Sequence, residues 1–112
     1  MTQKFIYDDF LDSLFISSKK EKDKVQGSAK LGDLVFDFTN EGKIVNVEIR
    51  HFSAFFKKLT NKKPPNIKDA SLTVDCKRDS VVIWITVRFK NKEEQKIPVY
   101  ISTQIAPKIA AA

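Results

Sequence analysis

Hydrophobic and polar residues alternate along two neighbouring stretches in the middle of the chain. In residues 34–39 apolar side chains occupy every second position, and residues 45–50 repeat this alternation after an Asn-Glu-Gly linker at residues 40–42. Successive side chains of a β-strand point to opposite faces, so each stretch predicts a strand with one apolar face. The short linker, with Gly42 at a positive φ angle, predicts that residues 34–49 form a β-hairpin.

The same pattern predicts five further strands and one loop. The strands are expected at residues 4–8, 14–17, 71–75, 81–89 and 97–102. Pro98 cannot donate a backbone hydrogen bond, so the last strand is expected at a sheet edge or at a bulge. The strand at residues 81–89 has one wholly apolar face. Val82 and Trp84 on its other face indicate that its start is buried on both sides. Residues 18–30 are polar and charged, and we expect an exposed loop there.

The hydrophobic period changes after residue 50. The apolar residues of the next segment are Phe52, Phe55, Phe56 and Leu59, which is the i, i+3, i+4, i+7 spacing of one helix face. Ser53 is the expected N-cap, and Lys57 and Lys58 lie in the last turn, where cations complement the helix dipole. A helix of about two turns is unstable alone, so its three phenylalanines must pack on the sheet. Pro64 and Pro65 follow and end the helical segment.

The predicted fold class is mainly β, or α+β, with antiparallel β-hairpins in the order β-β-β-β-α-β-β-β and one short helix packed on the sheet. The hairpins form either one continuous sheet or two packed sheets. With 112 residues the chain fits a single domain, expected at residues 1–105, with halves at residues 4–60 and 67–103. Residues 106–112, which end in three alanines, are expected to be a tail that is either native or a cloning remnant.

The two halves share a short sequence similarity. A shift of 67 residues aligns residues 6–16 with residues 73–83, with four identities among eleven positions. The identical pairs are Asp8 with Asp75, Asp12 with Asp79, Ser13 with Ser80 and Ile16 with Ile83. This alignment indicates either two hairpins with similar turns or a true repeat of two similar β-meanders.

Composition restricts the chemistry that the chain can perform. Cys76 is the only cysteine and His51 the only histidine. An internal disulfide and a zinc centre built from several Cys and His ligands are therefore excluded. No apolar run approaches the ~18 residues of a membrane helix, and the N-terminus lacks a signal-peptide core. We expect no cofactor, no metal, no membrane contact and a cytoplasmic location.

For each group of acidic residues, both a chemical role and a simple structural role can be considered. Asp8, Asp9 and Asp12 could bind a divalent cation or act as an acid and base pair, but they also suit a turn. Asp37 and Glu48 are expected on the polar face of the central hairpin. Carboxylates in such a position usually meet a neighbouring Lys or Arg, and we expect the structural role in both cases.

His51, Ser53 and Cys76 do not form a recognisable nucleophilic site. A catalytic triad needs a base that is oriented by a third group, and a nucleophile on a tight turn. No Gly-x-Ser-x-Gly motif occurs in the chain. We therefore expect structural roles for all three residues, no catalytic residues, and a protein that is not an enzyme.

Positive charge is concentrated in one window. The formal net charge is +6. Residues 57–68 contain no acidic residue and five lysines, which are Lys57, Lys58, Lys62, Lys63 and Lys68. These lysines could contact the phosphates of a nucleic acid without sequence preference, bind an acidic protein, or form a solvated face. They are the candidate binding residues of the chain.

A series of short motifs in the first half is similar to a known family. The motifs are Tyr7-Asp8, the acidic residue and apolar strand at 12–16, the strand at 35–38, the acidic-Gly turn and strand at 41–45, Val-Glu-Ile at 47–49, and Ser53 at a helix start. On these motifs residues 4–59 resemble the small prokaryotic family called domain of unknown function 2283. Asn46, where the family usually has Gly, and the lysine-rich segment 18–30 depart from its pattern.

The resemblance implies an antiparallel β-sheet with a short helix. Members are described beside small RelE-like toxins, which implies an antitoxin-like partner role. The resemblance brings no catalytic residues, and the second half of the chain is not part of the family pattern.

We therefore predict a small non-enzymatic cytoplasmic interaction protein, antitoxin-like, that binds a protein partner such as a small toxin. The alternative is a nucleic-acid-binding accessory protein that uses the lysine-rich helix end and loop. A homodimer formed by edge-strand pairing through residues 71–75 is a further expectation.

Overall fold

The computed structural model describes residues 4–102, which form eight strands and one short helix. In chain order the elements are β1 (Lys4–Asp8), β2 (Ser13–Ser17), β3 (Val25–Leu31), β4 (Leu34–Thr39), β5 (Ile44–Ile49), α1 (Phe52–Thr60), β6 (Ile67–Cys76), β7 (Ser80–Phe89) and β8 (Glu94–Ser102). The predicted fold class, antiparallel β with one short helix, is confirmed. The predicted tail at residues 106–112 lies outside the described residues.

Five strands precede the helix, one more than the sequence predicted. The prediction of a loop at residues 18–30 is wrong for the second half of this range, where the chain forms β3 and pairs with β4. β3 lies at the edge of its sheet and most of its side chains are exposed, so it shows no apolar alternation. A Cβ on Gly27 would lie 3.2 Å from Cζ of Phe38, so a small residue suits this position. The segment forms a strand because it pairs with β4, and not because of its own hydrophobic pattern.

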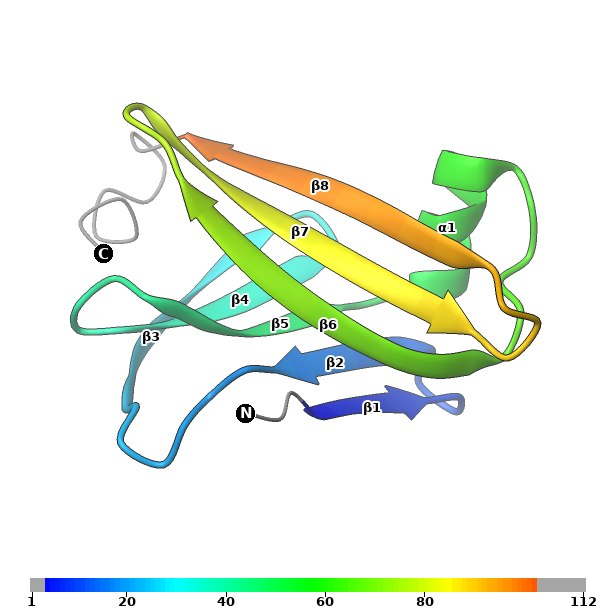
Figure 1. The fold of residues 1–112 in the computed structure, drawn as a ribbon, viewed down its shortest axis with the longest axis horizontal. Helices are drawn as coiled ribbons and strands as arrows, with labels where there is room; N and C mark the ends of the chain where they lie inside the picture. The colour runs from blue at the N-terminus through cyan, green and yellow to red at the C-terminus, as the bar shows by residue number, and fades with distance from the viewer. Residues whose placement is uncertain (1–3, 103–112) are drawn as a thin grey trace.

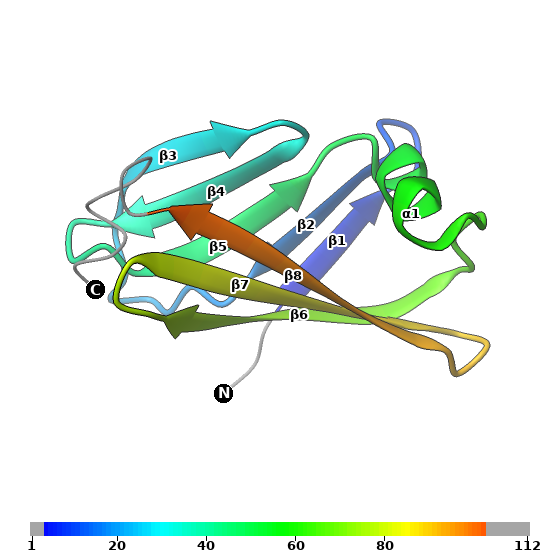
Figure 2. The same cartoon turned by 90° about the horizontal axis from the view of Figure 1, so that it is seen from above.

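The strands form two antiparallel sheets (Figure 1). The larger has the order β1-β2-β5-β4-β3, and the smaller has the order β6-β7-β8. In the larger sheet β3, β4 and β5 follow one another through hairpins while β2 lies beside β5, which is a Greek-key arrangement. β6 contacts β1 and β2, and Figure 2 shows the sheets as two layers. Of the two arrangements that the sequence left open, the protein has two packed sheets.

The hydrophobic core lies between the inner faces of these sheets. β7 contributes Val81, Ile83, Ile85, Val87 and Phe89. The larger sheet contributes Leu14, Ile16, Leu34, Phe36, Ile44, Val47 and Ile49. Full burial of one such side chain favours folding by about 1.5–3 kcal/mol, so these two apolar faces hold the layers together.

α1 lies at one end of the two layers and contacts both of them (Figure 2). The ring of Phe52 meets that of Tyr7 on β1 at a centroid distance of 5.9 Å, and Phe56 meets Phe89 on β7 at 5.3 Å. Both contacts are edge to face, a favourable geometry for aromatic rings. The predicted packing of the helix phenylalanines is confirmed. Leu59, predicted on the same apolar face, is instead 52% exposed.

Two details of the strand predictions are also confirmed. Gly42, in the turn between β4 and β5, has a φ angle of 81°. Pro98 lies in β8, which is an edge strand of the smaller sheet. Within residues 4–102, no helix is long and apolar enough to cross a membrane.

Candidate functional site

The acidic trio at the first turn is divided between separate structural roles. Asp8 accepts hydrogen bonds from the backbone N–H groups of Phe10 and Leu11, at 3.0 and 3.1 Å. Asp9 is exposed. Asp12 has a left-handed backbone, with φ of 53°, and its carboxylate is engaged by the helix. Asp8 and Asp12 therefore have the structural role that was predicted for them, and Asp9 lies exposed between them in the turn.

Asp12 supplies the cap of α1 from across the structure. Its carboxylate accepts hydrogen bonds from the backbone N–H of Ser53 at 3.0 Å, from the Ser53 hydroxyl at 2.9 Å and from the Tyr7 hydroxyl at 2.6 Å. The N-cap position belongs to His51, whose φ is 54° and whose side chain makes no capping bond. The predicted N-cap role of Ser53 is therefore wrong, because Asp12 satisfies the free N–H group of Ser53 instead.

The hydrogen bond between Tyr7 and Asp12 shifts the pKa values of the two side chains in opposite directions. Burial by itself would raise the pKa of Asp12, but the hydrogen bonds from Tyr7 and Ser53 outweigh it and hold the pKa below its usual value. Burial, and then the hydrogen bond to Asp12, raise the pKa of Tyr7. A charged acceptor and a protonated donor are thus both favoured near neutral pH. The arrangement is a charge-assisted cap for the helix.

The carboxylates of the central hairpin have separate partners. Asp37 accepts hydrogen bonds from the Ser28 hydroxyl at 2.6 Å and from the Asn46 amide at 2.9 Å. Glu48 lies 3.5 Å from Nε of Arg50. The expected Lys or Arg neighbour is therefore present for Glu48, while polar uncharged groups take that place for Asp37.

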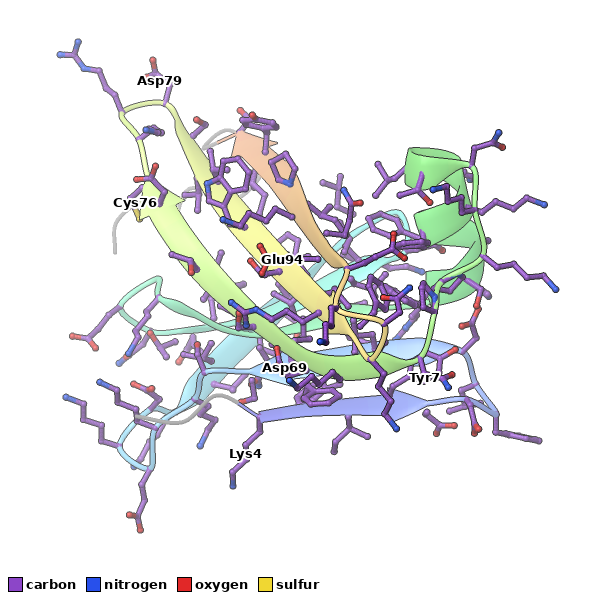
Figure 3. The ribbon with its side chains drawn as sticks, turned by 45° about the vertical axis from the view of Figure 1, so that its right-hand side comes forward. Lys4, Tyr7, Asp69, Cys76, Asp79 and Glu94 are labelled. Carbon is purple, nitrogen blue, oxygen red and sulfur yellow. The ribbon has the colours of Figure 1, made fainter. Side chains whose placement is uncertain are left out.

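The remaining candidates are not brought together. His51 Nδ1 lies 3.1 Å from a carboxylate oxygen of Asp33. Cys76 is exposed at the end of β6, far from Tyr7 and the helix in Figure 3. Across residues 4–102, no group of three or more His, Cys, Asp or Glu side chains could hold a metal ion.

The five predicted lysines are all exposed and lie at one end of the molecule. Lys57 and Lys58 are in the last turn of α1, and Lys62 and Lys63 follow in the loop. The turn between β7 and β8 adds Lys90 and Lys92, because the Lys90 N–H donates to the Asn66 carbonyl at 2.8 Å and ties this turn to the loop. We call residues 57–69 together with 88–94 the basic end.

The basic end holds the excess positive charge of the described chain. It contains eight Lys and Arg residues and three Asp and Glu residues. The rest of residues 4–102 contains eleven residues of each sign. The sequence identified five of the seven lysines. It missed Lys90 and Lys92, because only the tertiary contact joins the two segments.

A second surface lies on the outer face of the smaller sheet. On this face Trp84 of β7 is paired with Pro98 of β8 and Thr73 of β6, and Val82 is paired with Tyr100. Tyr100 is 66% exposed and Trp84 is 37% exposed. We call Val82, Trp84, Pro98 and Tyr100 the aromatic face. The predicted burial is confirmed for Val82 and wrong for Trp84, because no layer formed by residues 4–102 covers the sheet at this position.

The charged side chains beside the aromatic face are paired with one another. Arg88 donates hydrogen bonds to Asp69 at 3.1 Å and to Glu94 at 2.9 Å, and these bonds raise its pKa above the usual value. Lys96 lies 4.0 Å from Glu94. Asp69 and Glu94 are labelled in Figure 3, on the two strands that flank β7. The sequence signal for this surface was an aromatic residue at an outward position in each of two predicted strands.

A comparison with models of protein families gives a match in the first half of the chain. No curated protein and no solved structure matches this chain. The matching family is described as a protein of unknown function (DUF2283), and its model covers residues 4–53, which run from the start of β1 into the first turn of α1. The predicted resemblance to this family is therefore confirmed for the larger sheet of the chain.

Proposed function

We propose that this protein is a non-enzymatic interaction protein, antitoxin-like, that binds a protein partner through its aromatic face. The observation that carries the proposal is the exposure of Trp84 and Tyr100 on the uncovered face of the smaller sheet. Pro98, which is paired with Trp84 and is exposed, extends this surface with apolar atoms. Trp and Tyr are the residues that most often dominate the binding energy of protein interfaces.

The charge pattern favours a protein over a nucleic acid at this face. Arg88 and Lys96 are paired with carboxylates, so few positive charges remain free beside the aromatic residues. A nucleic acid would require unpaired Lys or Arg along the path of its phosphates. A protein with a largely uncharged apolar surface fits this face better.

The partner chosen for the experiment is a small toxin-like protein encoded by the reading frame next to this gene. Both proteins are purified and the affinity is measured by calorimetry at 0.1 and 0.5 M NaCl. We expect binding that changes little with salt, because an apolar interface is not screened. The double variant Trp84→Ser, Tyr100→Ser should weaken binding at least about 30-fold, since the loss of even one such anchor costs about 2 kcal/mol or more.

The matched control is Lys62→Gln, Lys63→Gln, which changes two exposed residues away from the aromatic face. It should leave the affinity within about 3-fold of the wild type, as is usual for contacts outside an interface. Circular dichroism confirms that all variants fold. Full affinity in the Trp84, Tyr100 variant, or binding that is lost at 0.5 M NaCl, would contradict the proposal.

The second candidate function is binding of nucleic acid by the basic end. Its support is the concentration of seven lysines in segments that meet around the Asn66 carbonyl. A labelled DNA duplex and a labelled RNA hairpin are titrated by fluorescence anisotropy from 50 to 200 mM NaCl. Phosphate contacts predict a steep loss of affinity with salt, and each Lys→Gln change within the basic end should reduce the salt slope by about 1.

Two further expectations stay predictions. One is a cytoplasmic location. The other is a homodimer through an edge strand, for which β6, the strand that contains residues 71–75, is an edge of the smaller sheet. Fluorescence microscopy of a tagged chain tests the first, and a proline placed at Thr73 tests the second.

A further inference from the structure

The turn between β1 and β2 presents two apolar side chains to solvent. Phe10 is 91% exposed and Leu11 is 64% exposed. Phenylalanine is among the residues most often buried in folded proteins, so this exposure is informative. No loop, strand or helix within residues 4–102 covers the pair.

The turn is held rigidly in this conformation. One carboxylate oxygen of Asp8 accepts both the Phe10 and the Leu11 backbone N–H groups. On the other side Asp12 is fixed by Ser53, and the Phe52 N–H donates to the Asp12 carbonyl at 2.9 Å. An exposed apolar pair on a fixed backbone loses little conformational entropy when it binds, which is a property of preorganised interface anchors.

A hollow of about 310 Å³ opens beside the same turn. Its walls are Tyr7, Phe52, Ser53, Lys63, Pro64, Pro65, Asn66 and Ile67. The volume lies at the lower end of the range of about 300–1,000 Å³ for pockets that hold small ligands, which suits a side chain of the size of Phe10. The wall is partly apolar, through Phe52, Pro64, Pro65 and Ile67, and partly polar, and Lys63 stands at it with Lys62 next in the chain.

The turn and the hollow have opposite charge. Asp8 and Asp9 directly precede Phe10 in the chain and are both exposed. The hollow belongs to the basic end, where positive charge is in excess. The exposed carboxylates before Phe10 are therefore matched by Lys63 at the wall of a partly apolar hollow, and both features are found on this chain.

The turn and the hollow are also neighbours on the molecule. Tyr7 and Ser53 line the hollow, and both donate hydrogen bonds to Asp12, which is two residues from Phe10. Phe10 is too exposed to occupy the hollow of its own copy. A two-fold axis near Asp12 would let two copies exchange these contacts, because an isologous interface uses the same patch on both subunits.

We propose that the chain forms a two-fold symmetric dimer in which Phe10 and Leu11 of each copy dock into the hollow beside Pro64 and Pro65 of the other. Asp9 of one copy then faces Lys63 of its partner. This interface is separate from the aromatic face, so the dimer and the proposed protein partner use different surfaces.

Sedimentation velocity of the full chain from 1 to 500 μM tests the proposal. We expect a concentration-dependent dimer. Phe10→Ser with Leu11→Ser should raise the dimer dissociation constant at least about 30-fold, as expected for loss of central apolar anchors. Both side chains are exposed, so the fold is retained, and circular dichroism checks this. The control Leu59→Ser changes an exposed apolar residue on α1 and should leave the constant within about 3-fold.

A charge exchange tests the arrangement of the interface. Asp9→Lys and Lys63→Glu should each weaken the dimer, and the two together should restore it to within about 3-fold of the wild type, as complementary charges do across an interface. A monomer at all concentrations overturns the proposal. A dimer that ignores the Phe10, Leu11 variant also overturns it and points to edge-strand pairing. A dimer that survives Trp84→Ser, Tyr100→Ser separates this result from the test of the partner-binding face.

Discussion

Two turns of this protein share an Asp-Ser pair, but the aspartate makes different contacts in each turn. The turn between β1 and β2 contains Asp12-Ser13, and the turn between β6 and β7 contains Asp79-Ser80. The first lies beside α1, and the second lies at the opposite end of the molecule (Figure 1). Asp12 accepts two hydrogen bonds from Ser53 at the start of α1 and one from Tyr7 on β1, whereas Asp79 is exposed at its turn.

The aligned residues also occupy different positions in the pairing of their strands. Asp8 is paired with Ser13, whereas the aligned Asp75 is paired with Val82 and forms an ion pair with Lys77 at 3.0 Å. The comparison shows that an Asp-Ser turn favours a hairpin in both places. The wider role of its aspartate comes from the element that packs beside it. Whether the two halves derive from a repeat stays a prediction.

The largest difference between the turns is expected in stability. Asp12→Ala should lower the free energy of unfolding by about 2 kcal/mol, because it removes a helix cap and leaves the Tyr7 hydroxyl without its acceptor. Asp79→Ala should change it by less than about 0.5 kcal/mol, as is usual for exposed positions. Urea unfolding, followed by the fluorescence of Trp84, the single tryptophan, measures both. Equal effects of the two substitutions would remove the distinction between the turns.

The second difference is expected in acid. The pKa of Asp12 is lowered in the folded protein, so its stabilising contribution is present above the unfolded value of about 3.9 and is lost as the pH falls through the folded pKa. The stability gap between the wild type and Asp12→Asn should therefore narrow from pH 6 to pH 2.5.

Urea unfolding at several pH values measures this effect. Some acid sensitivity should persist in Asp12→Asn, because the hydrogen bond from the Lys20 backbone N–H lowers the pKa of Asp23 as well. A gap that stays constant for Asp12→Asn would show that its carboxylate is not stabilised in the charged form.

The smallest effect concerns the hydroxyl that reaches the first turn from β1. Tyr7→Phe keeps the edge-to-face contact with Phe52 and removes only the 2.6 Å bond to Asp12. We expect a loss of about 1 kcal/mol, and a smaller lowering of the Asp12 pKa. Equilibrium unfolding and NMR titration of the Asp12 side chain measure the two quantities. If neither the free energy of unfolding nor the Asp12 pKa changes, the Tyr7 hydroxyl contributes nothing to the stabilisation of the charged Asp12 side chain.

Much of the fold could be predicted from the sequence, because burial of one sheet face imposes a period of two on the residues. Alternation predicted the extent of β1 and of the central hairpin, and the three-four spacing predicted α1. β3 was not predicted, because an edge strand with both faces largely exposed carries no such period. The lysines of the basic end were found as a run in the chain, whereas Lys90 and Lys92 join them only through folding.

The sequence by itself determined the antiparallel β class, the place of the single helix after the central hairpin, and the apolar faces of the strands that form the core. These properties follow from local backbone geometry and from the burial that each apolar face requires. The tertiary structure alone decided that two sheets stack, that Asp12 caps a helix that begins 40 residues later, and that Phe10 and Trp84 remain exposed. These depend on which elements become neighbours, and the hydrogen bonds and uncovered faces that result join residues far apart in the chain.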